Sequence, residues 1–398
     1  MKYDFDHIQS MHDTNSAKWG EMKSIFGNDN VIPMWIADMD FPAARPIVEA
    51  LKKRVAHELY GYTHPGASLV EVIVDRLQHE FNWRIEPDWV VFTPGITSAT
   101  SAAIRALTHP GDEIILQEPV YYPFFTNVIS SGCQIATNEL KLVGGRYEMD
   151  FDDLQSRFQR KKGMRDNPSR VKAIILCNPH NPVGRVWNRA QLMQLGEIAI
   201  KHGATIISDE VHCEITYEGH NHTPFASLSK EFEQNCIICM APSKTFNLAG
   251  LNASSIINPN KKLRDTFNEV RTAMIEGPNL FGLVAMEAAY RYGDEWLMQL
   301  LDYLQENLDF MMTYFRERIP RINVIKPQGT YLVWLDCRAL GLDNMALREF
   351  MRNKARVGLS DGFLFGAGGS GFQRMNIACP KAILEEALCR IDTAINLL

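Results

Sequence analysis

The chain has 398 residues, of which 46% are hydrophobic and 22% charged, and its formal net charge is −6 at pH 7. This composition is ordinary for a globular protein with room for more than one domain, and the acidic balance argues against a nucleic-acid or anionic-membrane partner. The first ten residues lack the apolar core of a signal peptide, and no apolar run approaches the roughly 18 residues that span a bilayer. We therefore expect a cytoplasmic protein.

The eight cysteines lie mostly inside apolar runs, which is typical of small buried side chains in a reducing compartment. Cys236 and Cys239 form a C-x-x-C pair, read either as a metal or redox motif or as part of a strand. Residues three apart in a strand point to opposite faces, and no second pair stands at metal-site spacing. We therefore expect these two cysteines to be structural.

Residues 1–44 have little periodicity, and their most distinctive part is an apolar segment, 31–42, interrupted by Asp38 and Asp40. This segment is either an arm packing its aromatic residues on the body or, because of its acids, the rim of a cleft. Two amphipathic helices are expected next, with apolar residues on one face: Ile47, Val48, Leu51, Val55 and Leu59 in the first, and Leu69, Ile73, Leu77 and Phe81 in the second.

From residue 89 apolar strands alternate with helices. The alternation predicts βαβ units and an α/β fold, with a mainly parallel sheet covered by helices on both faces. Past residue 259 helices dominate, and two short strands with a terminal helix indicate a smaller α+β domain. The predicted strands are 89–93, 113–117, 171–177, 205–208, 236–240, 323–326 and 331–335. One predicted helix follows the turn at 94–98 and ends at 107, and the others span 121–132, 189–202 and 294–318.

Ligands of an open α/β sheet bind beyond the carboxyl ends of its parallel strands. The segment 95–98 (Gly-Ile-Thr-Ser) offers backbone amides at a helix start, read as an anion site or as a simple cap. The segment 121–123 (Tyr-Tyr-Pro) offers an aromatic ring, for a planar ligand or for the core. Two Asn-Pro pairs and a glycine in 178–184 force a defined loop that presents Asn181.

Two further strand ends carry charged residues. A carboxylate at the end of a buried strand is costly unless paired, so we expect a cation opposite Asp209. After the strand 236–240 we expect a turn with Ser243 and Lys244. Lys244 is read either as an ordinary surface lysine or as an amine held in a cleft to form a Schiff base, where desolvation keeps it nucleophilic.

An anion-binding helix start, an aromatic plate, an amide, a carboxylate and a lysine are together what pyridoxal 5'-phosphate (PLP) requires. The helix start takes its phosphate, and the aromatic ring stacks on its pyridine ring. The carboxylate keeps the pyridine nitrogen protonated, so that the ring acts as an electron sink, and the lysine forms the Schiff base. The order of these features at five strand ends predicts PLP as the cofactor.

The motifs N-P-H-N-P-V-G (178–184), S-D-E-V-H (208–212) and S-K-T-F-N-L-A-G-L (243–251) resemble signatures of the fold-type-I PLP enzymes of the class I/II aminotransferase superfamily. The resemblance covers essentially the whole chain. Within that superfamily, P-M-W-I-A-D-M-D-F, Y-G-Y, P-V-Y-Y-P-F, Y-L-V-W-L-D and R-M-N-I-A-C-P resemble the carbon–sulfur lyases of the cystathionine β-lyase and cystalysin type.

The resemblance implies a homodimer with shared active sites. In each chain it implies an N-terminal arm with part of the small domain at 1–45, a large PLP-binding domain at 46–290 and a small C-terminal domain at 291–398. It implies that Lys244 is the Schiff-base lysine, and that Tyr121 stacks on the ring and takes part in catalysis. It also implies that Asp209 pairs with the pyridinium and that Asn181 binds the 3'-oxygen. The phosphate would be held by Ser243, by the amides of Ile96 and Thr97, and by Tyr62 of the neighbouring subunit. The substrate α-carboxylate would be held by Arg374 and by the backbone near Ala37.

Two positions depart from ordinary aminotransferases. Many of those carry an arginine eight residues after the lysine, where this chain has Asn252, and a tyrosine three residues after the aspartate, where it has His212. Both departures fit the lyase branch. We expect His212 to contact the cofactor, the alternative being a satisfied structural histidine.

The predicted reaction is a β-elimination from cystathionine, cysteine, cystine or related S-conjugates, giving a thiol, pyruvate and ammonia. Two alternatives stay open at this point. An aminotransferase shares the early steps but passes the amino group to the cofactor, and a regulatory or interaction protein retains the fold for another use.

Overall fold

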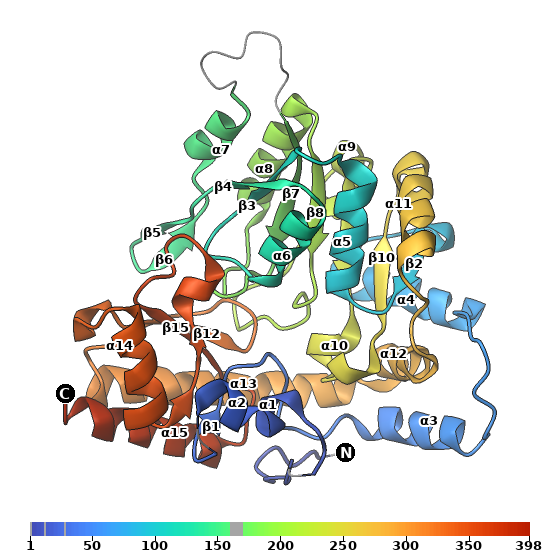
Figure 1. Cartoon of the computed structure of the whole chain (residues 1–398). Coiled ribbons are helices and arrows are strands. Elements are labelled where there is room, and N and C mark those ends of the chain that lie inside the picture. The colour runs from blue at the N-terminus through green and yellow to red at the C-terminus, as the bar shows by residue number, and fades with distance from the viewer. Residues whose placement is uncertain (1, 12, 28, 160–169) are drawn as a thin grey trace.

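The computed structural model describes residues 2–11, 13–27, 29–159 and 170–398. A central sheet contains β2 (Val90–Thr93), β3 (Glu113–Leu116), β4 (Gln134–Thr137), β7 (Val171–Cys177), β8 (Thr205–Asp209), β9 (Cys236–Met240) and β10 (Ser254–Ile257). Its order is β2-β10-β9-β8-β7-β3-β4, and β10 runs antiparallel to both its neighbours while the other described pairs are parallel (Figure 1). The predicted α/β fold class is confirmed.

Helices cover both faces of this sheet. One face packs on α4 (Ala67–Phe81), α8 (Arg189–His202) and α12 (Leu280–Tyr292), and the other on α5 (Ile96–Leu107), α6 (Pro123–Ser130) and α11 (Lys261–Met274). Neighbouring residues of one strand enter opposite cores, as Ile206 and Ile207 do in β8. Because both faces are buried, the strands are continuous apolar runs, which is why the sequence pattern identifies them.

A second, antiparallel sheet has the order β11-β12-β15-β14 and consists of β11 (Asn323–Ile325), β12 (Leu332–Asp336), β15 (Phe372–Asn376) and β14 (Ser360–Asp361). With it lie α13 (Asp294–Arg318), α14 (Asn344–Glu349) and α15 (Lys381–Ile395) (Figure 1). The N-terminal segment joins this part, because β1 (Ile32–Pro33) pairs with β13 (Val357–Gly358). The boundaries at 45 and 290 stay a prediction.

The remaining elements are short or peripheral: α1 (Ala17–Gly20), α2 (Met22–Phe26), α3 (Arg45–Val55), α7 (Phe151–Arg157), α9 (Lys230–Glu233), α10 (Pro242–Thr245) and the hairpin of β5 (Lys141–Val143) and β6 (Arg146–Glu148). Among the helices of the described residues, none has both the length and the apolar composition of a membrane span.

Several details differ from the sequence expectations, including the strands β4, β14 and β15, which the sequence did not predict. The first amphipathic helix, α3, ends at Val55, and Leu59 is an exposed loop residue just after Glu58, whose φ is +62°. Lys244 lies in the short helix α10 instead of a turn, because Pro242 at the first position fixes a helical φ. The strand β10 was not predicted, since half of it is serine; buried Ser254 donates its hydroxyl to the carbonyl of Thr93.

Candidate active site

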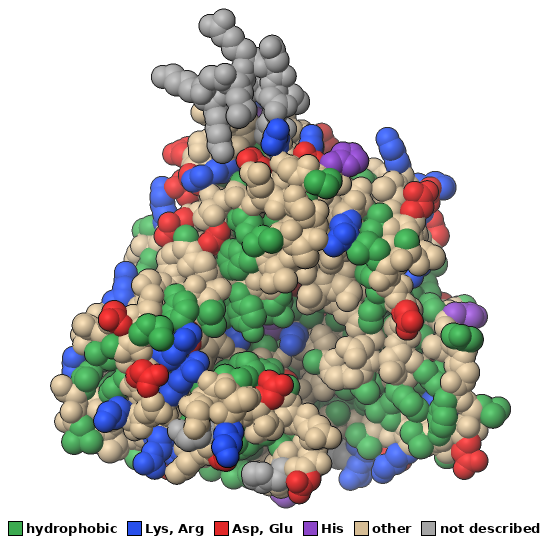
Figure 2. All heavy atoms as spheres, viewed as in Figure 1, with side chains coloured by type: hydrophobic (Ala, Val, Ile, Leu, Met, Phe, Trp, Pro, Cys, Tyr) green, Lys and Arg blue, Asp and Glu red, His purple; other side chains and the backbone are tan. Residues whose placement is uncertain are grey.

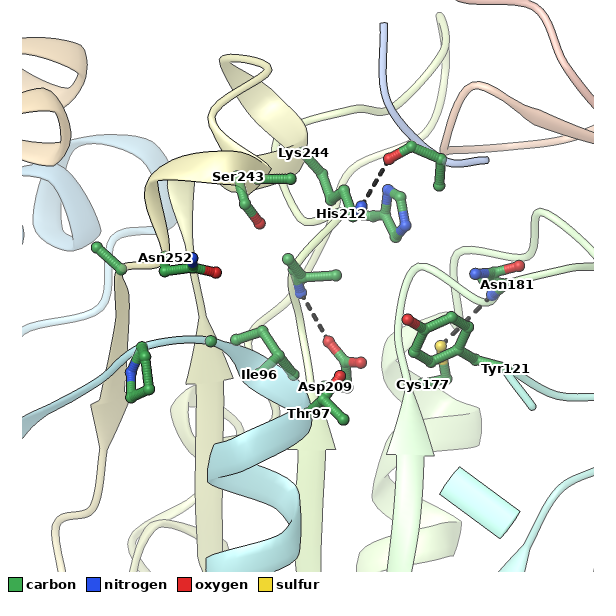
Figure 3. A pocket seen from close by; sticks show the side chains of 16 residues that line it. Ile96, Thr97, Tyr121, Cys177, Asn181, Asp209, His212, Ser243, Lys244 and Asn252 are labelled. Atoms are coloured by element: carbon green, nitrogen blue, oxygen red, sulfur yellow. Dashed lines mark hydrogen bonds between the residues drawn. The ribbon is translucent and has the colours of Figure 1, made fainter. Parts of the chain in front are cut away.

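A cavity opens where the strands of the central sheet end, and Figure 2 shows this face of the molecule hollowed between the sheet and the helices below it. The cavity brings together most of the predicted site residues, which come from widely separated parts of the chain (Figure 3). Those in its wall are Ala37, Ile96, Thr97, Tyr121, Asn181, Asp209, His212, Ser243 and Lys244. Cys177, Val211 and Asn252 also line it.

Lys244 projects from α10 into the cavity, where its Nζ donates a hydrogen bond of 2.6 Å to the carbonyl of Ala37 (Figure 3). Desolvation, together with the smaller effect of the Arg374 charge, lowers the pKa of Lys244 to about 8, and the charges of Asp38 and Asp209 oppose this shift. An amine with such a pKa is neutral in a useful fraction of molecules near neutral pH. It can therefore act as a nucleophile or as a base.

Asp209 ends β8 and is 4% exposed. Its Oδ1 accepts a hydrogen bond of 3.1 Å from the amide of Val211, but no cation of the described residues forms an ion pair with it. The cation expected opposite Asp209 is therefore not an ion-paired side chain of this part of the chain, and the expectation stays a prediction. Burial raises the pKa of Asp209 to about 7. A buried carboxylate that faces a cavity without a counter-charge fits the cationic ring nitrogen of PLP.

Another part of the cavity wall offers an anion site. α5 begins at Ile96 with no side chain capping its first turn, so the amides of Ile96 and Thr97 face the cavity wall at the positive end of the helix. Ser243 and Asn252 lie at the same end, away from Asn181 and Tyr121 (Figure 3). These residues fit the phosphate of PLP.

Arg374, on β15, is 3% exposed and reaches the site from the second sheet. Its Nη1 donates to Asn181 Oδ1 at 2.9 Å, and its Nη2 donates to the carbonyl of Trp35 at 2.5 Å. Its Nε has no hydrogen-bond partner among the described residues. Burial lowers the pKa of Arg374 to about 10, so it stays cationic near neutral pH and keeps a donor available for a carboxylate.

Tyr121 lies just before α6 with its ring at the cavity, beside Asn181 and Cys177 (Figure 3). Burial raises the pKa of Tyr121 to about 12, so its hydroxyl is protonated. His212 is 2% exposed, and its ring packs against Tyr331 at 5.8 Å between centroids. Burial lowers the pKa of His212 well below its ordinary value. Its Nδ1 has no partner within the described ranges, which differs from a fully satisfied structural histidine.

Two other predicted residues lie differently from their neighbours. Tyr62 is fully exposed in the loop between α3 and α4 and is not among the residues that line the cavity of its own chain. Its contact with the phosphate of a neighbouring subunit stays a prediction. Cys236 and Cys239 are buried in β9 and enter the cores on opposite faces of the sheet, as expected.

Several contacts of the site escaped the sequence reasoning. The Tyr331 hydroxyl donates to the carbonyl of Ala37 at 3.1 Å, and the Ser360 hydroxyl donates to that of Trp35 at 2.9 Å. Both residues belong to the region of the second, antiparallel sheet, and the expectation that ligands bind beyond the carboxyl ends of parallel strands does not apply there. Cys177, whose Sγ accepts from the Asn181 amide at 3.4 Å, ends a strand that was predicted, and only its apolar character hid it.

Comparison with known proteins places this geometry in a family. The model of the family "Aminotransferase class I and II" matches residues 30–391. The chain is 40% identical to cystathionine beta-lyase PatB of Bacillus subtilis, over 98% of this chain and 100% of PatB.

Two solved structures are similar over almost the whole chain. Cystalysin from Treponema denticola, which contains PLP, is 34% identical with a TM-score of 0.95, over 100% of this chain and 99% of that one. The PLP-bound C–S lyase from Staphylococcus hominis is 29% identical with a TM-score of 0.91, over 99% and 98%.

The fold and the site therefore define a PLP-dependent enzyme, and the chain belongs to the class I and II aminotransferase family. Within that family it belongs with the carbon–sulfur lyases of the PatB type. The family predicted from the motifs is confirmed.

Proposed function

We propose that this chain is a PLP-dependent carbon–sulfur β-lyase that cleaves L-cystathionine or related cysteine S-conjugates to a thiol, pyruvate and ammonia. The observation that carries the proposal is the presence, at one cavity, of an amine with a pKa of about 8 (Lys244) and a buried carboxylate with no ion-pair partner among the described residues (Asp209). When bound, PLP supplies an aldehyde for an amine and a cationic ring that withdraws electrons from the substrate Cα.

The reaction assigns different work to two cations. Arg374 holds the substrate α-carboxylate by hydrogen bonds from its planar guanidinium group, and this fixes the direction of the Cα–H bond. Lys244 Nζ removes the Cα proton as a general base. The Cβ–S bond then breaks, and its electron pair leaves with sulfur as a thiolate. Water hydrolyses the remaining three-carbon enamine to pyruvate and ammonia.

The other residues of the cavity hold the cofactor. Each assignment rests on the position and chemistry of the side chain described above and on the resemblance in sequence. We assign Asp209 to the ring nitrogen, Tyr121 to the ring face, Asn181 to the 3'-oxygen, His212 to the ring's surroundings, and Ser243 with the amides of Ile96 and Thr97 to the phosphate.

We also assign the chain to a homodimer in the cytoplasm. Support for the dimer comes from the exposed apolar residues Leu59, Tyr60 and Tyr62, in a region where Figure 2 shows hydrophobic side chains gathered near α3. In a dimer Tyr62 would contact the partner's phosphate site. Support for the cytoplasm comes from the cysteines, all eight of which are free thiols.

The proposal is tested by incubating the PLP-loaded protein with L-cystathionine. We expect one pyruvate and one free thiol for each cystathionine consumed. Amino transfer to an added 2-oxo acid without thiol release would instead assign an aminotransferase. Asn252 favours the lyase, because it lines the cavity at the position where many aminotransferases carry arginine. Turnover that survives Lys244→Ala would show that the reaction uses another site.

A further inference from the structure

Lys18, in α1, is a lysine with almost no exposed surface. It is 2% exposed, and its Nζ lies 2.8 Å from Asp40 Oδ2 and 3.6 Å from Asp38 Oδ1. Lysine is almost never buried to this degree unless it is paired. The two acids that interrupt the apolar segment 31–42 therefore have a common partner, although that partner lies about twenty residues earlier in the chain.

Two tryptophans join the same two chain segments. Trp19 Nε1 donates to Asp40 Oδ1 at 3.1 Å, and Trp35 Nε1 donates to the carbonyl of Lys18 at 3.3 Å. A helix as short as α1, with four residues, has little stability of its own. These contacts therefore define where α1 sits, and they fix Lys18 against the segment that carries Asp38 and Asp40.

The same segment presents its backbone to the two functional cations. The carbonyl of Ala37 accepts from Lys244 Nζ at 2.6 Å, and that of Trp35 accepts from Arg374 Nη2 at 2.5 Å. The alternate carbonyls, of Ile36 and Asp38, both accept from Asn376 Nδ2, at 2.7 and 2.5 Å. Segment 35–38 thus faces Lys244 and Arg374 through two carbonyls, while its neighbouring acid side chains face Lys18.

We propose that Lys18 is a positioning residue of the active site. Its ion pairs with Asp38 and Asp40 hold the carbonyls of Trp35 and Ala37 against Arg374 and Lys244, and its charge balances that of the two acids. The inference rests on the proposed function only in that it uses the same site. It concerns the orientation and the charge environment of Lys244, whichever reaction follows.

The charges around Lys244 predict the direction in which its protonation equilibrium should shift. Asp38 from the N-terminal segment and Asp209 from β8 favour its protonated form, and Arg374 from β15 disfavours it. His212 after β8 and Tyr331 before β12 are buried in their neutral forms. Without Lys18 the charge of Asp38 is no longer balanced, so protonation at Lys244 becomes easier. A residue that only filled space would leave this equilibrium unchanged.

The test uses the PLP-loaded protein and the pH midpoint of the absorbance change of the cofactor bound at Lys244. We expect Lys18→Met to raise this midpoint by about one pH unit, as loss of a nearby opposite charge does. Asp40→Asn removes a negative charge from the same cluster and should shift the midpoint the opposite way. Lys18→Arg should keep the midpoint within about 0.3 units of the unmodified protein, because it keeps the charge.

The matched control is Lys52→Met, which removes an exposed lysine paired with Glu49 on α3, away from the cavity, and should leave the midpoint unchanged. With L-cystathionine, Lys18→Met should raise KM about tenfold with a smaller change in kcat, since Arg374 loses the fixed carbonyl of Trp35.

Measuring the pH midpoint requires bound cofactor but no turnover. It therefore tests the role of Lys18 even if the unmodified protein released no thiol from cystathionine. Equal midpoints in Lys18→Met, Asp40→Asn and the unmodified protein would overturn the inference. If Lys18→Met did not fold, the downward shift expected for Asp40→Asn would still decide it.

Discussion

The two walls of the cavity are built in different ways. One wall consists of residues at or just beyond the ends of parallel strands: Asp209 at β8, Asn181 after β7 and Lys244 after β9. The other consists of segment 35–38, of which Ala37 lines the cavity, and of Arg374 on the antiparallel β15, which contacts the lining residue Asn181. The first wall is fixed by a sheet buried on both faces. The second is fixed by hydrogen bonds between side chains and backbone that lie more than 200 residues apart.

The two walls have different roles in the proposed reaction: the first carries the reacting groups and the second binds the substrate. The first wall holds the groups that the proposed reaction needs for proton transfer and charge, and a buried parallel sheet holds such groups rigidly. In the proposed reaction the second wall holds the substrate carboxylate. Changes in the first wall should therefore abolish turnover, whereas changes in the second should mainly weaken substrate binding.

The largest effect is expected for Lys244→Ala. Loss of the amine removes both the covalent link to PLP and the general base, so kcat for thiol release from cystathionine should fall by about 10³-fold or more. The absorbance band of the cofactor linked to Lys244 should also disappear. Lys261→Ala removes an exposed lysine that pairs with Asp265 and should change neither. A variant that keeps the band but loses turnover would mean that another amine holds the cofactor.

Asp209→Asn tests the uncompensated charge of the first wall in the cofactor-free protein. Burial raises the pKa of Asp209 from 3.8 to about 7. Between these values the folded protein keeps a proton that the unfolded chain has lost, so its free energy of unfolding falls as pH rises from about 4 to about 7 and stays lower above that. Asparagine does not ionise, so the free energy of unfolding of the variant does not fall in this way as pH rises. It should be the more stable protein at pH 8, by up to a few kcal/mol at roughly 1.4 kcal/mol per pKa unit.

Urea unfolding at pH 4 and at pH 8 measures this difference. A gain that is the same at both values would show that the change in packing, and not ionisation, is responsible. With PLP bound the sign should reverse at pH 8, because the ionised Asp209 then pairs with the ring nitrogen and Asn cannot replace that charge.

Arg374→Lys tests the grip of the second wall. Lysine keeps the positive charge but lacks the planar pair of donors, so the substrate carboxylate should lose about one charged hydrogen bond, roughly 1.5–3 kcal/mol. KM for cystathionine should rise by about tenfold to a hundredfold, with a smaller loss in kcat. Arg316→Lys, at a surface pair with Glu317, serves as the control. A loss confined to kcat would place Arg374 in the chemical step instead.

The two walls also differ in how far the sequence predicts them. Asp209, Asn181 and Lys244 are found from sequence because each follows an apolar run, and the ends of parallel strands meet at one edge of the sheet. The anion site at Ile96 follows from the same rule. The cation expected opposite Asp209 stays a prediction, because among the described residues no side chain forms an ion pair with Asp209, which lines the cavity.

The second wall carries no such pattern. Arg374 and the backbone near Ala37 were assigned only through resemblance to a family. Tyr331 was noted only as the first residue of a strand and motif, and Ser360 and Lys18 were not singled out. Their contacts join residues between 14 and 339 positions apart through single hydrogen bonds or ion pairs, which leave no periodic trace in the sequence. The serine-rich strand β10 was missed for a related reason, since its buried hydroxyls bond to neighbouring strands and look polar in the sequence.

The smallest effect is expected at a contact of Glu118 that supports the loop beneath Arg374. Glu118, just after β3, accepts from the amide of Ala367 at 2.6 Å and from the hydroxyl of Thr137 at 2.7 Å. The amide of Ala367 belongs to the loop that places the Phe365 ring under the guanidinium of Arg374, 5.0 Å from its centroid. Glu118→Ala frees this loop but removes no group that touches substrate. KM for cystathionine should therefore rise only severalfold, in keeping with about 1 kcal/mol for one hydrogen bond, and kcat should stay nearly constant.

Glu118→Gln is the matched control, because its amide oxygen accepts from Ala367 while its amide nitrogen donates to the Thr137 hydroxyl. It should behave almost as the unmodified protein does. If Glu118→Ala lowered kcat as strongly as it raised KM, the separation of the two walls would be wrong. Orientation of Arg374 by the Phe365 loop would then belong to the chemical step as well as to substrate binding.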